Sequence, residues 1–196
     1  MNMIQKNTAK IIRLLLKNID KNGYNINQIA RSIHISVGSS FKILKELEKN
    51  KIATSQVIGN GAYYHLNLDN PETIKLCEFL LLEEKRQLKG YAKLYSESLQ
   101  EFKKAELIML FGSILTKKEF NDIDVLFITK NPKEVSDFCL ELSKIRTKPL
   151  VPLILKKEGM IKELRNKNEA IISLIKEGII LKGESIFLEV IKNAKK

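Results

Sequence analysis

The residues best suited to chemistry in this chain stand close together, beside two apolar runs. Gly112 and Ser113 follow the first run, and Asp122 and Asp124 flank the start of the second. Glycine lets a backbone turn sharply and approach a ligand closely, and the serine hydroxyl and amide can face a phosphate. Two carboxylates two residues apart on a strand share one face, where they can bind Mg²⁺ together with phosphate oxygens. The spacing predicts a phosphate site next to a metal site.

Residues 107–129, LIMLFGSILTKKEFNDIDVLFIT, resemble the active-site signature of the nucleotidyltransferase superfamily, the polymerase-beta-like fold, in its minimal form. The resemblance implies that Gly112 and Ser113 hold a nucleoside triphosphate. It also implies that Asp122 and Asp124 are catalytic residues that bind divalent metal, with Mg²⁺ as the expected ion. Residues 177–187, EGIILKGESIF, resemble the closing segment of the same minimal domains.

The loop between the two motifs is shorter than the usual family form and contains no glycine. Its two lysines, Lys117 and Lys118, are candidate nucleotide-binding residues because their ammonium groups could contact phosphate oxygens. An ordinary solvent-exposed loop is the alternative explanation for both lysines.

A third carboxylate is expected from the resemblance, on a later strand. The matching strand here, residues 150–155, reads LVPLIL and contains no acid. Glu141 and Glu158 are the nearest acids, and neither is at the family position. Without this carboxylate, charge is missing where two divalent ions must be neutralised, and the base that activates the attacking hydroxyl is missing as well. We expect metal and nucleotide binding to remain possible and turnover to fall by orders of magnitude.

The rest of the C-terminal part predicts a domain over residues 106–196 with a small mixed sheet. Apolar runs predict strands at 107–111, 123–128, 150–155 and 179–181, and helical periodicity predicts helices at 132–145, 160–177 and 186–192.

The first 70 residues predict three helices followed by a β-hairpin. Helical patterns cover 8–19, 25–33 and 36–50, residues 20–24 break the first helix, and strands at 52–58 and 62–68 are joined by Asn60 and Gly61. Residues 27–68 in this order resemble a winged helix-turn-helix. The resemblance implies a DNA-binding domain over residues 1–70, in which the third helix enters a major groove.

The expected DNA surface is the side of the third helix opposite Phe41, Leu44 and Leu47. Its candidate DNA-binding residues are Ser36, Ser39, Ser40, Lys42, Lys45 and Lys49, together with Gln56 and Asn60 in the hairpin. Lysines mainly contact phosphates, whereas short serines can approach base edges. Protein contact or dimerisation is the alternative use of such a domain.

Residues 71–105 form a helical linker between the two domains, with helical patterns at 72–89 and 91–104. Its apolar surface could pack on the next domain or form a dimer interface. A homodimer would suit a DNA-binding domain that recognises symmetric half-sites.

The net charge of +11 favours a polyanionic partner, with nucleic acid first and a membrane surface second. Residues 1–70 carry ten Lys and Arg against four Asp and Glu. No apolar run approaches the roughly 20 residues that span a bilayer, and no signal peptide is visible. A cytoplasmic protein is expected, with Cys77 and Cys139 as buried free thiols and no zinc site.

Together these patterns predict an α+β protein: an N-terminal winged helix-turn-helix, a helical linker and a C-terminal nucleotidyltransferase-like domain. The expected function is a DNA-binding transcriptional regulator whose second domain binds nucleotide and Mg²⁺. The alternative is an active nucleotidyltransferase that modifies a small molecule or a partner protein, as antitoxin-like members do. A purely structural adaptor is a third possibility.

Overall fold

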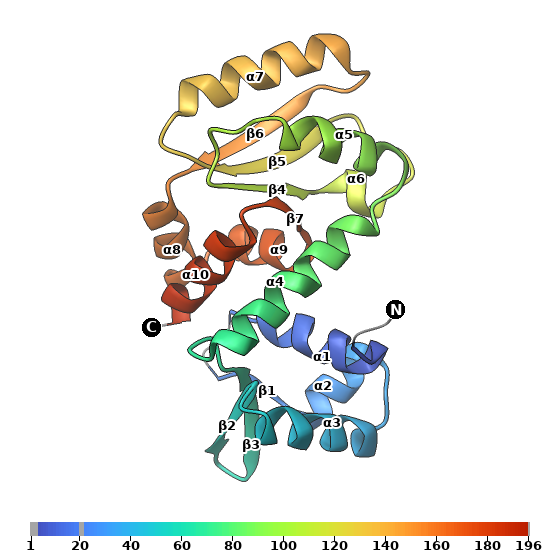
Figure 1. The fold of residues 1–196 in the computed structure, drawn as a ribbon, viewed down its shortest axis with the longest axis vertical. Helices are drawn as coiled ribbons and strands as arrows, with labels where there is room; N and C mark the ends of the chain where they lie inside the picture. Colours follow the sequence, from blue (N-terminus) through green and yellow to red (C-terminus); the bar gives the residue numbers. More distant parts are fainter. Residues whose placement is uncertain (1–3, 20–21, 196) are drawn as a thin grey trace. The chain divides into compact units, whose positions relative to one another are not determined.

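The computed structural model describes residues 4–19 and 22–195, and the chain is an α+β protein that divides into two compact units (Figure 1). The N-terminal unit extends to Leu80 and the C-terminal unit covers Leu81–Ala194. Helix α4 (Pro71–Arg86) is divided between them. Part of the predicted break at 20–24, Asp20 and Lys21, lies outside the described residues. No described helix has the length and apolar character needed to cross a membrane.

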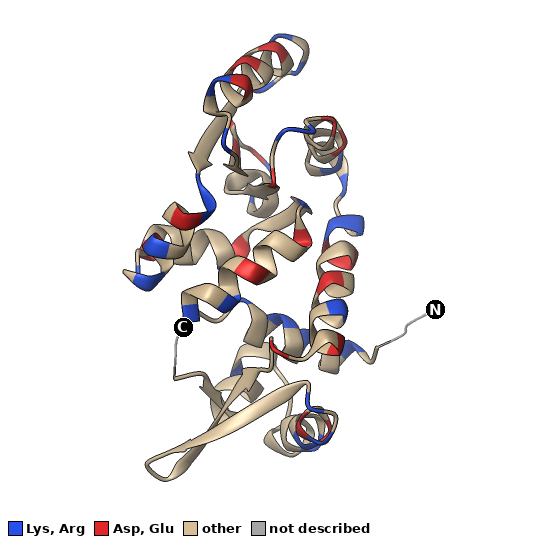
Figure 2. Cartoon of the chain, turned by 60° about the vertical axis from the view of Figure 1, so that its left-hand side comes forward, with Lys and Arg blue, Asp and Glu red and all other residues tan. Residues whose placement is uncertain are grey.

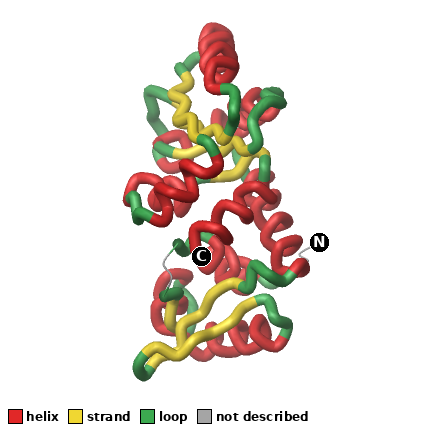
Figure 3. Tube along the Cα trace, turned by 90° about the vertical axis from the view of Figure 1, so that its left-hand side faces the viewer, coloured by secondary structure: helices red, strands yellow, loops and turns green. Residues whose placement is uncertain are grey.

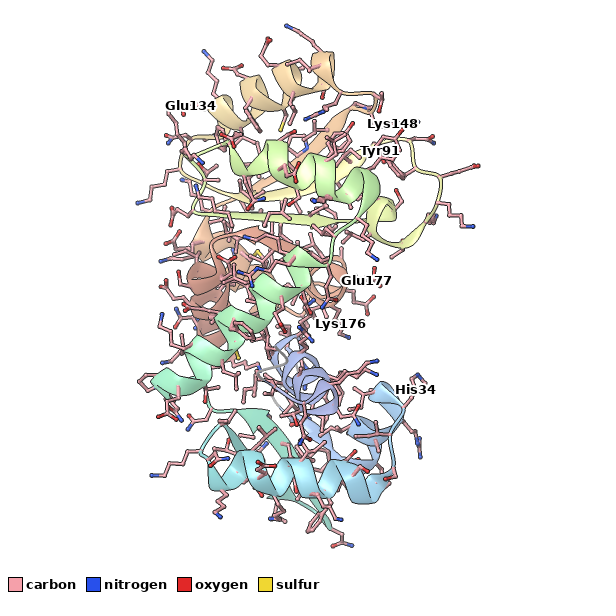
Figure 4. The ribbon with its side chains drawn as sticks, turned by 45° about the vertical axis from the view of Figure 1, so that its right-hand side comes forward. His34, Tyr91, Glu134, Lys148, Lys176 and Glu177 are labelled. Atoms are coloured by element: carbon pink, nitrogen blue, oxygen red, sulfur yellow. The ribbon has the colours of Figure 1, made fainter. Side chains whose placement is uncertain are left out.

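The three predicted N-terminal helices are present as α1 (Lys6–Leu16), α2 (Ile26–Ile33) and α3 (Val37–Lys49). Local side-chain hydrogen bonds fix where α2 and α3 begin. Asn25 forms a capping box with Gln28, and Ser36 Oγ accepts a hydrogen bond from the backbone N–H of Ser39 at 3.1 Å. Between the helices His34 adopts a left-handed conformation with φ 57°, which ends α2 and redirects the chain (Figure 4).

A three-stranded antiparallel sheet completes the N-terminal unit, in the order β1-β3-β2. Its strands are β1 (Tyr24–Asn25), β2 (Ala53–Ile58) and β3 (Gly61–Leu66). The sequence predicted the hairpin but not β1, which has only two residues. The predicted turn is wrong by one residue: Ile58 pairs with Gly61, so Gly59 and Asn60 make the turn, and Gly59 has the positive φ of 59°. In Figure 2 the hairpin is tan throughout, because residues 53–66 include no Lys, Arg, Asp or Glu.

A four-stranded mixed sheet forms the centre of the C-terminal unit, in the order β6-β5-β4-β7. The strands are β4 (Leu107–Phe111), β5 (Ile123–Ile128), β6 (Leu150–Leu155) and β7 (Ile179–Lys182). β4 is antiparallel to both β5 and β7, whereas β5 and β6 are parallel and are connected through α7 (Pro132–Ile145). The predicted small mixed sheet is confirmed.

Helices lie on both sides of this sheet (Figure 3). They are α5 (Gly90–Gln100), the single turn α6 (Ser113–Thr116), α7, α8 (Lys157–Arg165), α9 (Glu169–Glu177) and α10 (Glu184–Lys195). The single helix predicted at 160–177 is wrong. Lys167 takes a left-handed φ of 57°, and the side chain of Asn168 accepts hydrogen bonds from Ala170 and Ile171 to begin a new helix.

Helix α5 belongs to the core of the C-terminal unit. Leu88, Ala92, Tyr95 and Leu99 are buried in one cluster with residues of β4, β5 and α7. The fully buried Tyr95 joins α5 to the start of β6, because its hydroxyl donates to the Lys148 carbonyl at 2.8 Å and accepts from the Lys148 N–H at 2.9 Å. The unit therefore begins well before residue 106, where the sequence placed the domain boundary.

Both cysteines are buried free thiols, Cys77 in α4 and Cys139 in α7. Burial raises the pKa of the Cys77 thiol to about 12 and that of Cys139 to about 11. Because only the thiolate is nucleophilic, neither side chain is suited to chemistry at neutral pH.

Candidate functional site

The backbone of Gly112, in the turn after β4, lies close to the carboxylate of Asp124. Phe111, the last residue of β4, pairs with Asp124 on β5, and Gly112 follows with φ +81° and ψ −156°. A Cβ at Gly112 would overlap with Oδ2 of Asp124. Only glycine can occupy this position, because it alone tolerates both the backbone conformation and the close approach of the carboxylate.

The two aspartates form an uncompensated negative pair. Asp122 directly precedes β5 and Asp124 lies within it, and both are partly exposed. Burial, and then the charge of Asp122, raise the pKa of Asp124 above its usual value of 3.8. Neither carboxylate forms an ion pair with a cation of the described chain. The pair is thus a place where an external cation would relieve electrostatic repulsion.

Val151 occupies the neighbouring position on β6. It pairs with Asp124 in the parallel register of β5 and β6, and its side chain is 47% exposed. Within residues 4–19 and 22–195, no group of three His, Cys, Asp or Glu residues could hold a metal ion. The strand therefore presents an aliphatic side chain where a third metal-binding carboxylate would be needed.

The two carboxylates fit a single Mg²⁺ ion better than a pair of ions. Carboxylate oxygens are suitable ligands for this ion, which is commonly held by one or two carboxylates together with phosphate oxygens and water. The charge of Asp122 and Asp124 equals that of one divalent ion, so a second ion would depend on bound phosphates for its neutralisation and its ligands. The two carboxylates could hold a metal–nucleotide complex in which the phosphates supply the remaining oxygen ligands.

Ser113 and the two loop lysines lie near this site along the chain. Ser113 begins α6, and its carbonyl accepts a hydrogen bond from the Lys117 N–H at 2.8 Å. The side chains of Lys117 and Lys118 are exposed, and neither forms an ion pair with another described residue. The structure brings Gly112 and Asp124 into contact but does not bring these two lysines onto the carboxylates.

An aromatic contact that the sequence did not predict joins the loop before β5 to α5. Phe120 meets Tyr91 of α5 edge-on, with ring centroids 5.7 Å apart. Tyr91 is labelled in Figure 4. Phe120 also packs against the buried cluster of the unit. Because Phe120 stands two residues before Asp122, this contact helps to fix the approach to β5. Its signal in the sequence is a lone aromatic residue in a polar loop.

The model of the family Polymerase beta, Nucleotidyltransferase matches residues 93–187. This part of the chain, which contains the glycine turn and both aspartates, is therefore a nucleotidyltransferase-fold domain. The resemblance read from residues 107–129 is confirmed at this level. No curated protein matches the chain, and no solved structure does.

Helix α3 carries the residues expected to contact DNA, with two corrections. Ser39, Lys42, Lys45 and Lys49 are exposed, as is the capping residue Ser36. Ser40 is fully buried, and its hydroxyl has no hydrogen-bond partner among the described residues.

Phe41, expected in the core, is 49% exposed. The buried stripe of the helix is Ser40, Leu44 and Leu47, at i, i+4 and i+7. Leu44 and Leu47 are buried as predicted, and the error is confined to the start of the helix, where Ser40 and not Phe41 belongs to the stripe.

The exposed lysines of α3 differ in their partners. Lys45 forms an ion pair with Glu48 at 2.9 Å, and Glu48 also accepts a hydrogen bond from Ser55 of β2. Lys42 has no such partner among the described residues. It lines a groove of about 520 Å³ between α3 and the start of α1, where Lys6 supplies a second cation and Glu46 a carboxylate. Sequence reasoning missed Lys6 because its position next to α3 depends on tertiary packing.

The hairpin places Gln56 and Asn60 in solvent, as expected for wing residues. The hairpin contains no Lys, Arg, Asp or Glu from residue 53 to residue 66. Val57 is 80% exposed and Ile58 is 41% exposed. Phosphate contacts from this hairpin could come only from neutral donors such as the Gln56 and Asn60 amides.

Proposed function

We propose that the chain is a DNA-binding regulator whose nucleotidyltransferase-fold domain binds a nucleoside triphosphate with Mg²⁺. In this proposal the N-terminal unit is a winged helix-turn-helix that contacts double-stranded DNA through α3. The C-terminal unit binds the nucleotide at Gly112, Ser113, Asp122 and Asp124. A homodimer would present two N-terminal units to a two-fold symmetric site.

The observation that carries the nucleotide part is the unpaired carboxylate pair beside the glycine turn. Asp124 is partly buried and repelled by Asp122, and both effects destabilise its charged form in the free protein. Its carboxylate also lies close to the Gly112 backbone. A bound Mg²⁺ would neutralise this pair and polarise the phosphate oxygens that share it. The Gly112 and Ser113 backbone would approach the same phosphates, since no side chain intervenes at Gly112.

Val151 argues for binding rather than fast turnover. A valine beside Asp124 adds neither charge for a second metal ion nor a base for the acceptor hydroxyl. This chain's own residues would bind and orient the nucleotide, and no described acid is close enough to both aspartates to complete a three-carboxylate site.

The DNA part rests on the arrangement of α2, α3 and the hairpin, and on the exposed lysines of α3. A second helix, a turn and a third helix followed by two antiparallel strands is the order in which winged helix-turn-helix domains are built. Lys42 and Lys49 are exposed on α3, and Lys6 adds a cation beside Lys42. These charges would contact phosphates and give salt-dependent affinity.

Isothermal titration of the full chain with ATP or GTP tests the nucleotide part, with and without Mg²⁺. We expect Mg²⁺-dependent binding that falls at least about tenfold in Asp124→Ala, because a phosphate-bound ion loses a direct ligand. Glu141→Ala is the matched control, since Glu141 is an exposed acid of α7 paired only with Lys144. Equal binding by all three proteins, or no binding to the native chain, would overturn this part.

Fluorescence anisotropy with duplex DNA between about 50 and 200 mM salt tests the DNA part. We expect the double substitution Lys42→Glu and Lys49→Glu to weaken binding and to flatten its salt dependence. Lys93→Glu with Lys144→Glu changes the net charge equally on exposed positions of the C-terminal unit. If the two double variants lose affinity equally, the N-terminal unit is not the DNA-binding surface.

An active nucleotidyltransferase is the second candidate, favoured by the contact between Gly112 and Asp124 within a domain of this family. It would transfer a nucleotide from a triphosphate to a small molecule or a partner protein. Incubation with labelled triphosphate, Mg²⁺ and candidate acceptors tests it. Label transfer that is lost in Asp122→Ala would favour this candidate over a non-catalytic nucleotide-binding domain.

A further inference from the structure

The exposed surface of α3 consists of two parallel stripes of different chemistry. Val37, Phe41 and Lys45 lie at i, i+4 and i+8 on one stripe, and Ser39, Lys42 and Lys49 lie on the other. Val37 is 47% exposed and Phe41 is 49% exposed. The first two turns of α3 thus expose two large apolar side chains to solvent.

Two lysines border these apolar side chains. The Lys45 ammonium lies 5.9 Å from the centroid of the Phe41 ring and is also paired with Glu48, whereas Lys42, the next residue along the helix, has no such partner among the described residues. An apolar surface bordered by lysines matches a partner whose apolar groups lie beside negative charge. A second copy of this chain, which carries a net charge of +11, would bring like charges together at this surface.

The serines at the start of α3 are already engaged with each other. Ser36 Oγ donates to Ser39 Oγ at 2.9 Å and accepts from the Ser39 N–H at 3.1 Å. Ser40 points into the core. Ser39 keeps a free O–H to donate, but the largest exposed side chains near the start of the helix are Val37 and Phe41.

The major groove of DNA offers one apolar group, the C5-methyl of thymine, and aliphatic or aromatic side chains contact it. Phosphates on both sides of that groove supply the complementary negative frame. We infer that Val37 and Phe41 contact thymine methyl groups, so that α3 favours thymine-containing sites. This inference rests on the proposed binding of duplex DNA by α3 and adds the base that it recognises.

Removing the methyl group alone tests the inference. The full chain is titrated by anisotropy, at fixed salt, with a duplex of alternating dA and dT and with the same duplex in which deoxyuridine replaces every thymidine. We expect the thymine duplex to bind more tightly, by about three- to fivefold for each methyl group that is buried. Phe41→Ala and Val37→Ser should each reduce this ratio toward one, while binding to the uracil duplex changes less.

Val57→Ala is the control, because Val57 is an exposed apolar residue of the hairpin and not of α3. It should retain the preference for thymine, and thermal unfolding should show that all variants remain folded. Tight but equal binding of both duplexes by the native chain would overturn the inference and leave the proposed function intact. Salt-dependent binding to neither duplex would instead overturn the proposed DNA function.

Discussion

Asp124 and Val151 lie side by side on the parallel strands β5 and β6, at paired positions of the same register. Paired residues of adjacent strands project from the same face of a sheet, so the valine is directed to the side that carries the Asp124 carboxylate. A carboxylate at this position would complete a three-acid site without any change in the backbone. The effect of the missing third carboxylate can thus be examined at one residue.

Val151→Asp should strengthen metal binding. The new carboxylate adds a ligand and a negative charge next to Asp124, so we expect Mg²⁺ or Mn²⁺ affinity to rise about tenfold. Val151 is 47% exposed, so the substitution should cost little stability, on the order of 1 kcal/mol or less. Metal titration followed by calorimetry measures the change. Val151→Asn is the uncharged control, and an equal gain in both variants would refute the role of the charge.

Gly112→Ala should destabilise the C-terminal unit and weaken nucleotide binding. The added Cβ overlaps with the Asp124 carboxylate, and the alanine backbone must keep φ +81°. Together these two effects cost about 1–3 kcal/mol. Urea denaturation gives the change in the free energy of unfolding. Gly159→Ala in α8 is the control, because its Cβ would have no neighbour within 4 Å. That variant should be unchanged or stabilised by up to about 1 kcal/mol.

Asp124→Asn should stabilise the protein at neutral pH and weaken the proposed metal binding. Burial and Asp122 raise the pKa of Asp124, so the folded chain holds this proton more firmly than the unfolded chain does. The contribution of this proton to the free energy of unfolding is therefore fully present below pH 3.8, the usual pKa of an aspartate. It is lost as the pH rises through the raised pKa of Asp124. The difference in stability between Asp124→Asn and the native chain, measured by thermal unfolding across pH, should decrease toward about pH 4. A constant advantage at every pH would contradict this origin.

The fold of the C-terminal unit and the position of its candidate site were largely predictable from sequence because their signals are local. Asp-x-Asp on an apolar strand, a Gly-Ser pair after another, and an acid-free third strand were all readable in the order of the residues. The contact between Phe120 and Tyr91 was not, because it joins positions that are far apart in the chain. Lys167 concealed a helix break, since a lysine in left-handed conformation carries no signal comparable to glycine.

The face of α3 was misread for a different physical reason. Phe41 is a large apolar residue of the helix and was expected in the core. Instead the small Ser40 is buried and Phe41 lies in solvent. Hydrophobicity alone locates a buried stripe only to within one residue when a small polar residue adjoins a large apolar one.

Lys42→Ala should weaken DNA binding more than Lys45→Ala. Lys45 is already paired with Glu48 at 2.9 Å, so its charge is partly offset before DNA arrives, whereas Lys42 has no partner among the described residues. Anisotropy at several salt concentrations should show that the salt dependence decreases by close to one phosphate contact for Lys42→Ala and by less for Lys45→Ala. The reverse order would mean that Glu48 releases Lys45 on binding.

Two serine substitutions in α3 should have opposite effects on stability. Ser40→Ala removes a buried hydroxyl without a partner among the described residues, so we expect a gain of about 1 kcal/mol and unchanged DNA binding. Ser36→Ala removes the cap that accepts from the Ser39 N–H and should cost about 1 kcal/mol. Thermal or urea unfolding measures both. A loss of stability in Ser40→Ala would indicate that its hydroxyl is bonded in solution.

The hydrogen bonds between the Tyr95 hydroxyl and both backbone groups of Lys148 also determine how this chain can be divided. A fragment that starts at residue 106 would retain the glycine turn and both aspartates, but it would lack α5 and leave an apolar face of the sheet in water. Such a fragment should aggregate on expression. The shortest piece suitable for separate study of the nucleotide chemistry has to begin before Leu88, the first residue of this buried cluster.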